Sequence, residues 1–214
     1  MVEDKDIKKT GTTTVGIVCK DGIVLCADKR VTSGYLISYK KFKKIAQITD
    51  NIAVTVAGSV SDVQLTIKII KAELQLKKIR TGSDVTVKEA VNLLSSIVYG
   101  NIRQMSMIPS IAHFIIAGKD DEGFHCYDLS PDGSIIECDE YVSSGSGSVM
   151  AYGVLETLYK PGMTVDEALK LGAKAINAAV QRDIASGNGI DIVTVTKEGV
   201  KKVISKEIEY KIEI

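Results

Sequence analysis

The sequence is poor in the residues from which metal sites and serine-protease triads are built. It has only two histidines, His113 and His125, which leaves little material for a Ser-His-Asp triad or a multi-histidine metal site. Its four cysteines lie inside strand-like runs and show no C-x-x-C spacing. We therefore interpret them as reduced core residues rather than as a metal or redox site: Cys19, Cys26, Cys126 and Cys138.

The sequence also lacks a net charge and long apolar runs. Lys+Arg 27 and Asp+Glu 27 cancel, so there is no electrostatic footprint for a nucleic acid or an anionic membrane. No apolar run approaches the length of a membrane span, and residues 1–11 are charged, unlike a secretory signal. We expect no nucleic-acid partner, no membrane association and a cytoplasmic location.

The order of the predicted elements indicates the fold class. A chain of 214 residues fits a single domain with a sizeable core. Strands and pairs of helices alternate in blocks, which favours antiparallel sheets, and the strand at 23–27 is apolar on both sides, which favours helices outside the sheets. We expect an α+β fold in which two antiparallel sheets lie between two helix layers, a four-layer α-β-β-α sandwich. Predicted strands cover residues 13–19, 23–27, 45–48, 52–57, 112–117, 124–129, 134–138, 190–195 and 200–204, and predicted helices begin near residues 61, 86, 148 and 164.

Local signals predict how several of these elements begin and turn. Residues 86–89 and 164–167 both read Thr-x-x-Glu, which is the capping-box pattern of a helix N-terminus. Ser61 or Asp62 can cap the first helix. The Asp-Gly pair at 21–22 predicts a hairpin with a type I′ turn, because both residue types tolerate positive φ.

The junction of Gly11 and Thr12 is the first candidate for chemistry. A threonine hydroxyl is a weak nucleophile without a neighbouring base, and the α-amine of an N-terminal threonine can be that base. Its pKa of about 7.7–8.0 leaves it partly neutral at working pH. This arrangement requires cleavage of the Gly11–Thr12 bond, and Gly11 would let the backbone bend there. The alternative is that the threonine run is ordinary strand sequence.

Asp28 and Lys44 carry a second hypothesis. By default Asp28 is a solvated strand end and Lys44 the last charge of a surface lysine run. If Lys44 instead points inward and pairs with Asp28, its positive charge near Thr12 would favour the neutral amine and a developing alkoxide.

Two glycine-containing segments have structural alternatives. Residues 145–148, Gly-Ser-Gly-Ser, follow a strand and open a helix; they resemble a phosphate loop only superficially, because Met150 replaces the third glycine, and a helix cap is the simpler interpretation. Residues 181–187 end the last helix, where Gly187 is expected as a left-handed C-terminal cap.

Taken together and in order, these motifs closely resemble a proteasome β subunit of the archaeal type. The resemblance spans essentially the whole chain and implies the N-terminal nucleophile hydrolase fold, a four-layer sandwich. It rests on Gly-Thr-Thr-Thr-Val-Gly at 11–16, Ala-Asp-x-Arg at 27–30, Lys43-Lys44, Ala57-Gly58 with Asp62, Gly-Ser-Gly-Ser-x-x-x-Tyr-Gly-Val-Leu-Glu at 145–156, and Arg-Asp-x-x-Ser-Gly at 182–187.

The resemblance implies a threonine endopeptidase. Residues 1–11 would be a propeptide that removes itself between Gly11 and Thr12, and residues 12–214 a single catalytic domain. Thr12 would be the nucleophile and, once freed, would supply the α-amine base. The other implied site residues are Lys44, which tunes the nucleophile, Asp28, which holds Lys44, the backbone N–H of Gly58 for the oxyanion, and the polar network of Ser146, Asp183 and Ser186.

The same alignment places Val31, Val56 and Val60 around the pocket for the residue before the cut. Such apolar walls predict cleavage mainly after hydrophobic residues, although Phe42 could narrow the pocket. Thr32 and Gly58 are expected to pair with the substrate backbone as an added strand.

The resemblance also implies partners. These are proteasome α subunits, other β subunits in stacked heptameric rings, unfolded polypeptide substrates, and a regulatory ATPase that acts through the α ring, with no cofactor. Two alternatives remain at this point: a non-catalytic ring subunit of the same fold, and a small-molecule amidohydrolase of the same superfamily.

Overall fold

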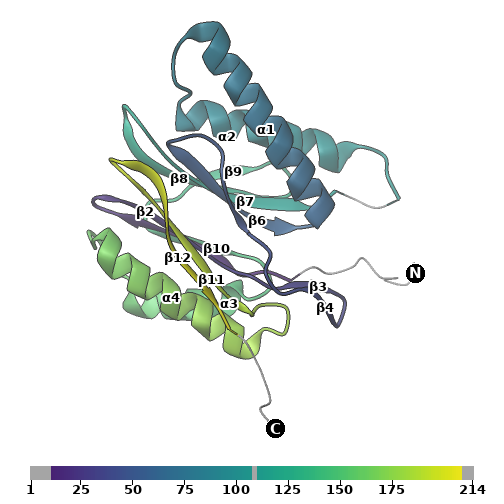
Figure 1. The fold of residues 1–214 in the computed structure, drawn as a ribbon, viewed down its shortest axis with the longest axis vertical. Coiled ribbons are helices and arrows are strands. Elements are labelled where there is room, and N and C mark those ends of the chain that lie inside the picture. The colour runs from purple at the N-terminus through teal and green to yellow at the C-terminus, as the bar shows by residue number, and fades with distance from the viewer. Residues whose placement is uncertain (1–10, 108–109, 209–214) are drawn as a thin grey trace.

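The protein folds as two antiparallel sheets between two helix layers (Figure 1). The computed structural model describes residues 11–107 and 110–208. The strands are β1 Thr14–Cys19, β2 Gly22–Asp28, β3 Val31–Ser33, β4 Leu36–Tyr39, β5 Ile45–Gln47, β6 Ile52–Gly58, β7 Ala112–Asp120, β8 Gly123–Leu129, β9 Ile135–Glu137, β10 Tyr141–Ser144, β11 Gly189–Thr196 and β12 Gly199–Glu207. The helices are α1 Val60–Thr81, α2 Val87–Arg103, α3 Ser148–Leu158 and α4 Val165–Arg182.

The strand order defines the sheets. One five-stranded sheet has the order β10-β1-β2-β11-β12 and the other β5-β6-β7-β8-β9, with antiparallel pairing throughout. A separate two-stranded sheet, β3-β4, projects from the end of the first sheet (Figure 1). The predicted α+β, four-layer α-β-β-α sandwich is therefore confirmed.

Three buried apolar clusters join the four layers. One lies between α1, α2 and the β5–β9 sheet and includes Phe114 and Leu94. A second joins α3 and α4 to the other sheet and includes Ile17 and Leu171. The third lies between the two sheets. Strand β2 is buried along its whole length because it lies between the second and third clusters, as its unbroken apolar sequence predicts.

Both predicted capping boxes are present. In α2 the Thr86 hydroxyl accepts from Glu89 N while the Glu89 carboxylate accepts from Thr86 N. The same reciprocal pair forms between Thr164 and Glu167 at the start of α4. Each box satisfies two backbone donors that the first helical turn leaves unpaired.

Two other local predictions at element starts are wrong. Helix α1 begins one residue after Ser59, so Ser61 and Asp62 lie inside its first turn, and Asp62 instead accepts from Ile111 N at 3.3 Å. The β1–β2 hairpin exists, but Cys19 pairs with Gly22, so its loop is Lys20-Asp21 and it has no positive φ. Asp21 faces α4 and accepts from Val165 N at 2.9 Å, a tertiary contact that the local pattern could not reveal.

The predicted cap at Gly187 is also wrong. Helix α4 ends at Arg182, and the capping residue is Asp183 in an extended conformation. Gly187 lies further on, where its N–H donates to Asp28 at 2.9 Å. The β3–β4 hairpin was not predicted, because its strands are short and β4 is exposed.

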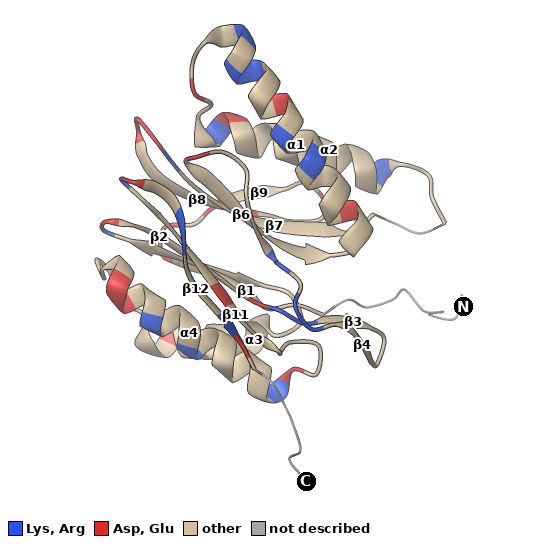
Figure 2. Ribbon diagram, viewed as in Figure 1, with Lys and Arg blue, Asp and Glu red and all other residues tan. Residues whose placement is uncertain are grey.

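The distribution of charge matches the balanced totals. Figure 2 shows lysine and arginine interspersed with aspartate and glutamate in both helix layers. None of the helices within residues 11–107 and 110–208 is long and apolar enough to cross a membrane.

Candidate active site

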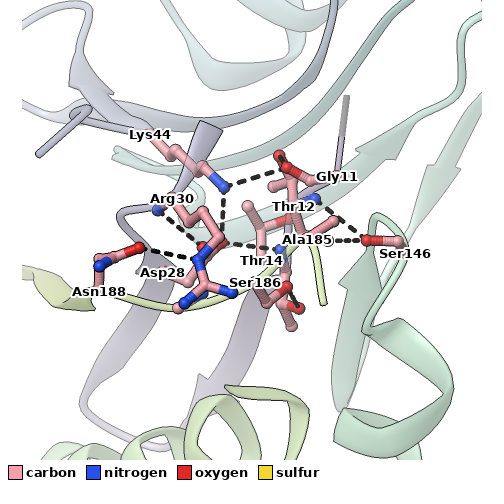
Figure 3. A network of polar contacts seen from close by, with 12 residues as sticks. Gly11, Thr12, Thr14, Asp28, Arg30, Lys44, Ser146, Ala185, Ser186 and Asn188 are labelled. Atoms are coloured by element: carbon pink, nitrogen blue, oxygen red, sulfur yellow. Dashed lines mark hydrogen bonds and ion pairs between the residues drawn. The ribbon is translucent and has the colours of Figure 1, made fainter. Parts of the chain in front are cut away.

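The predicted site residues come from five segments of the chain and meet at one end of the first sheet (Figure 3). Thr12 precedes β1, Asp28 ends β2, and Lys44 precedes β5. Ser146 precedes α3, while Asp183 and Ser186 follow α4. Strand β1 pairs with β2 and with β10. The sheet register therefore brings the start of β1 close to the ends of β2 and β10.

Asp28 is the centre of the network and is completely buried. Its carboxylate accepts from the backbone N–H groups of Thr13 (2.9 Å), Arg30 (3.0 Å) and Gly187 (2.9 Å), and from the Lys44 ammonium (2.7 Å). Backbone donors cannot rotate away, so they fix both carboxylate oxygens in place. A buried carboxylate with this many donors has a fixed position, and it holds the lysine in one position as well.

Lys44 points inward, so the ion pair that the sequence left open is present. Its side chain is 2% exposed. Its ammonium donates to Asp28 and, at 3.4 Å, to the carbonyl oxygen of Gly11. Burial lowers the pKa of Lys44, and the Asp28 carboxylate opposes this shift. The result is a cation held beside the peptide bond that joins Gly11 to Thr12.

The Gly11–Thr12 peptide is held from both sides. The Thr12 hydroxyl donates to the Gly11 carbonyl oxygen at 2.7 Å, and Thr12 N donates to the Ser146 hydroxyl at 3.2 Å. Gly11 N donates to the Thr32 hydroxyl at 3.2 Å. A Cβ on Gly11 would lie 1.7 Å from the Cβ of Ala185, so only glycine fits this backbone path.

A second polar group lies on the other side of Thr12. The Ser146 and Ser186 hydroxyls both donate to Asp183 Oδ2 at 2.6 Å. Ser186 also shares a hydrogen bond of 2.6 Å with the Thr13 hydroxyl. Asp183 therefore orients the hydroxyl that receives the Thr12 N–H, and it links the α3 and α4 ends of the site.

The remaining predicted residues line a small pocket beside Thr12. Val31, Val56, Val60 and Gly58 face it, together with Phe42. Lys44 is the only charged residue among the described residues that line it. Thr32 is not among them; its observed contact is the one with Gly11 N.

The roles of several residues in the network were not predicted from the sequence. Thr13 was treated as strand sequence, although its N–H and hydroxyl bind Asp28 and Ser186. The Arg30 guanidinium donates to Asn188 Oδ1 at 2.8 Å (Figure 3) and to the Ile184 carbonyl oxygen at 2.7 Å. Asn188 has φ 62, the single positive value outside glycine in the described chain. The repeated threonines were a signal for Thr13, whereas nothing local marks Asn188.

The described residues of the site do not form a metal-binding group. Among the described residues, no group of three or more histidine, cysteine, aspartate or glutamate side chains is arranged to hold a metal ion. The polar groups of the network are instead satisfied by one another and by backbone N–H groups.

Comparisons with known proteins identify the family of this chain. The family model "Proteasome subunit" matches residues 8–195. A proteasome subunit beta of Ferroglobus placidus is 44% identical over 209 residues, covering 98% of this chain and 97% of its own. The proteasome subunit beta of Methanococcus maripaludis strain C5 is 44% identical over 200 residues (93% and 90%), and that of Archaeoglobus fulgidus is 43% identical over 209 residues (98% and 95%). The chain therefore belongs to the proteasome subunit family.

Proposed function

We propose that this chain is a catalytic β subunit of a proteasome core particle, an endopeptidase with Thr12 as its nucleophile. Its relatives are proteasome β subunits, a family of proteases. The observation that carries the proposal is the Gly11 carbonyl oxygen, which accepts from the Thr12 hydroxyl and from the buried Lys44 ammonium. A carbonyl polarised in this way beside a hydroxyl is prepared for acyl transfer.

The first reaction would be removal of residues 1–11, most of which lie outside the described residues. The Thr12 oxygen attacks the Gly11 carbonyl carbon, the C–N bond breaks, and the nitrogen takes the proton. Water then hydrolyses the resulting ester and leaves a Gly11 carboxylate and a free Thr12 amine. Lys44 stabilises the developing oxyanion, since its ammonium already contacts this oxygen.

The freed Thr12 then has its own base. An α-amine with a pKa of about 7.7–8.0 accepts the hydroxyl proton at neutral pH. Ser146, oriented by Asp183, already contacts this nitrogen, and Ser186 completes the same group. Lys44, fixed by Asp28, favours the alkoxide, and we assign the oxyanion of the substrate to the Gly58 backbone N–H.

The pocket supports a preference for hydrophobic residues before the cut. Val31, Val56 and Val60 supply apolar walls, and no acidic side chain lines it in the described structure. We further propose that Thr32 and Gly58 pair with the substrate backbone as an added strand, which would make cleavage tolerant of sequence.

Membership of the family implies assembly with other proteasome subunits. We propose that these are β subunits of a heptameric ring and α subunits of an adjoining ring, in the cytoplasm. Unfolded polypeptides would be the substrates, delivered by a regulatory ATPase through the α ring. We propose no cofactor, because the network itself supplies the nucleophile, base and cation.

The test is Thr12→Ala compared with Thr12→Ser in particles assembled with the α subunit. Wild type should lose residues 1–11 and cleave fluorogenic peptides after hydrophobic residues. Thr12→Ser keeps a hydroxyl and should retain part of both activities. Thr12→Ala should retain the leader and no peptidase activity.

Two results would contradict the proposal. Active, assembled particles that still carry residues 1–11 would exclude the α-amine as base. Normal assembly without peptidase activity in wild type would instead support the non-catalytic ring subunit. Faster cleavage after basic residues would overturn only the assignment of the pocket.

A further inference from the structure

Cys126 and Cys138 lie opposite each other at the edge of the second sheet. Tyr127 pairs with Glu137 in the β8–β9 register, which makes Cys126 and Cys138 the next facing residues. Cys138 N donates to the Cys126 carbonyl at 2.8 Å. Facing residues of antiparallel strands have Cα atoms about 4.5–5.5 Å apart, which is within the range of a disulfide.

The two thiols also point the same way. Both side chains pack into the apolar cluster between the sheets, where Cys126 is buried and Cys138 is half-buried. Successive residues of a strand alternate between faces, so two facing cysteines necessarily share one face. Both conditions for a bond, short backbone separation and a common direction, are therefore met while the cysteines are free.

The two members of the pair differ in reactivity. Cys126 is buried, whereas Cys138 is half-buried and can be reached from solvent. The neighbouring Cys126 thiol lowers the pKa of Cys138, although partial burial opposes this shift. The same contact and burial raise the pKa of Cys126. A more exposed thiol with a lowered pKa is the one that reacts first.

The other two cysteines provide the contrast. Burial raises the pKa of Cys19 to about 12 and raises that of Cys26 as well. Both are buried against the α3–α4 layer. They are expected to remain inert as ordinary apolar residues.

We propose that Cys126 and Cys138 form a redox pair that closes into a disulfide when a peroxide reaches Cys138. The Cys138 thiolate attacks one peroxide oxygen, breaks the O–O bond and becomes a sulfenic acid, and the displaced hydroxide takes the thiol proton as water. The Cys126 thiol then attacks the Cys138 sulfur and releases a second water. Two thiols are oxidised to one disulfide, and one hydrogen peroxide is reduced to two waters.

The bond would fix the end of β9 to β8 where the chain crosses between sheets. Only two residues separate Cys138 from β10, which pairs with β1 and leads into Ser146. The pair therefore lies on the connection that carries the chain from one sheet to the other.

The test is peptide mapping of the reduced protein after brief treatment with hydrogen peroxide and alkylation of free thiols. Trypsin does not cut before Pro161, so it leaves both cysteines in one peptide, residues 120–170, and a second protease must cut after Glu137. Without reductant, residues 123–137 should stay joined to 138–140 as a species two hydrogens lighter than the sum. Reductant should separate them. Before oxidation, Cys138 should alkylate at least about tenfold faster than Cys19, given their different thiolate fractions.

Matched variants distinguish this pair from general oxidation. Cys19→Ala should give the same cross-linked peptides as wild type. Cys138→Ser should give none, and Cys126→Ser should accumulate a Cys138 sulfenic acid that a dimedone probe captures. Fully alkylated Cys126 and Cys138 in peroxide-treated wild type, or a bond to Cys19 or Cys26, would overturn the proposal. Wild type alone decides the outcome if a variant fails to fold.

Discussion

Residues 11–107 and 110–208 contain two buried lysine–aspartate pairs, and one of them lies at the candidate site. Lys44 pairs with Asp28 at 2.7 Å, and Lys29 pairs with Asp191 at 3.0 Å. Both lysine side chains are almost completely buried, at 2% and 5% exposure. Burial and ion pairing, taken alone, do not distinguish them.

Their partners do distinguish them. The Lys29 ammonium also donates to the Ser205 hydroxyl at 2.9 Å, and the Asp191 carboxylate forms an ion pair with a second lysine, Lys202, at 2.7 Å. This pair joins β2 to β11 and β12 and has no contact with the Gly11–Thr12 peptide. Lys44 instead uses its second contact on the Gly11 carbonyl. The second acceptor of the lysine, rather than its burial, indicates a chemical role.

The largest difference between the two pairs is expected when each lysine is replaced by arginine. Lys44→Arg moves the charge onto a larger planar group that cannot reproduce the contact with Gly11, so peptidase activity should fall at least about 100-fold. Lys29→Arg should leave activity nearly unchanged. Initial rates on a fluorogenic peptide measure both, with circular dichroism to verify folding. Equal losses in the two variants would remove the distinction.

A smaller effect is expected from Gly11→Ala, which tests how closely the peptide must approach Lys44. The added methyl would collide with Ala185, and a displacement of this size should slow leader removal by about tenfold or more. Ala185→Gly in the same chain should restore part of the rate. Intact mass against time measures removal of residues 1–11.

Gly100→Ala is the matched control for this prediction. Gly100 lies in α2, and nothing lies within 4 Å of the position its Cβ would occupy. Its rate of leader removal should equal that of wild type. If Gly11→Ala processes at the same rate as Gly100→Ala, the steric argument fails.

The smallest effect is on the pH dependence of stability, where the two pairs should act in opposite ranges. Burial opposes the shift, but hydrogen bonds from Lys202, Ser205 and Lys29 lower the pKa of Asp191 below 3.8. As pH falls below about 4, the unfolded chain therefore binds this proton first, and stability is lost. Asp191→Asn should make the acid side of the stability profile shallower.

Lys44 should act at the alkaline end. Burial lowers its pKa from 10.5, so between the lowered value and 10.5 the unfolded chain binds more protons than the folded one. Its contribution to stability therefore grows as pH rises through that range, and Lys44→Met should remove the rise. Urea unfolding at fixed protein concentration measures both profiles. A steeper loss of stability in acid for Asp191→Asn, or a steeper rise in alkali for Lys44→Met, would contradict the assigned pKa shifts.

Much of the fold could be predicted from the sequence because its signals are local. The alternation of strand and helix blocks, both capping boxes and the fully apolar β2 depend on residues a few positions apart. The failures occurred where tertiary contacts override local preference. Asp21 binds the start of α4 instead of forming a type I′ turn, and Gly187 binds Asp28 instead of capping a helix.

The site was less accessible to residue-level reasoning. Nothing near Lys44 in the sequence shows that it points inward, so its pair with Asp28 stayed one of two alternatives until the resemblance to a known family favoured it. The need for glycine at position 11 depends on Ala185, which follows the last helix. Cys126 and Cys138 were interpreted as ordinary core residues because spacing rules address neighbours in sequence, whereas strand register brings these two together.

The wide spacing of the Asp28 partners also affects biosynthesis. Thr12 is translated before Ser146 and Gly187, which hold its backbone and Asp28. The network around Thr12 therefore cannot be complete until Gly187 has been synthesised. The threonine is translated before the residues that surround it, so its complete surroundings form only after translation has passed Gly187.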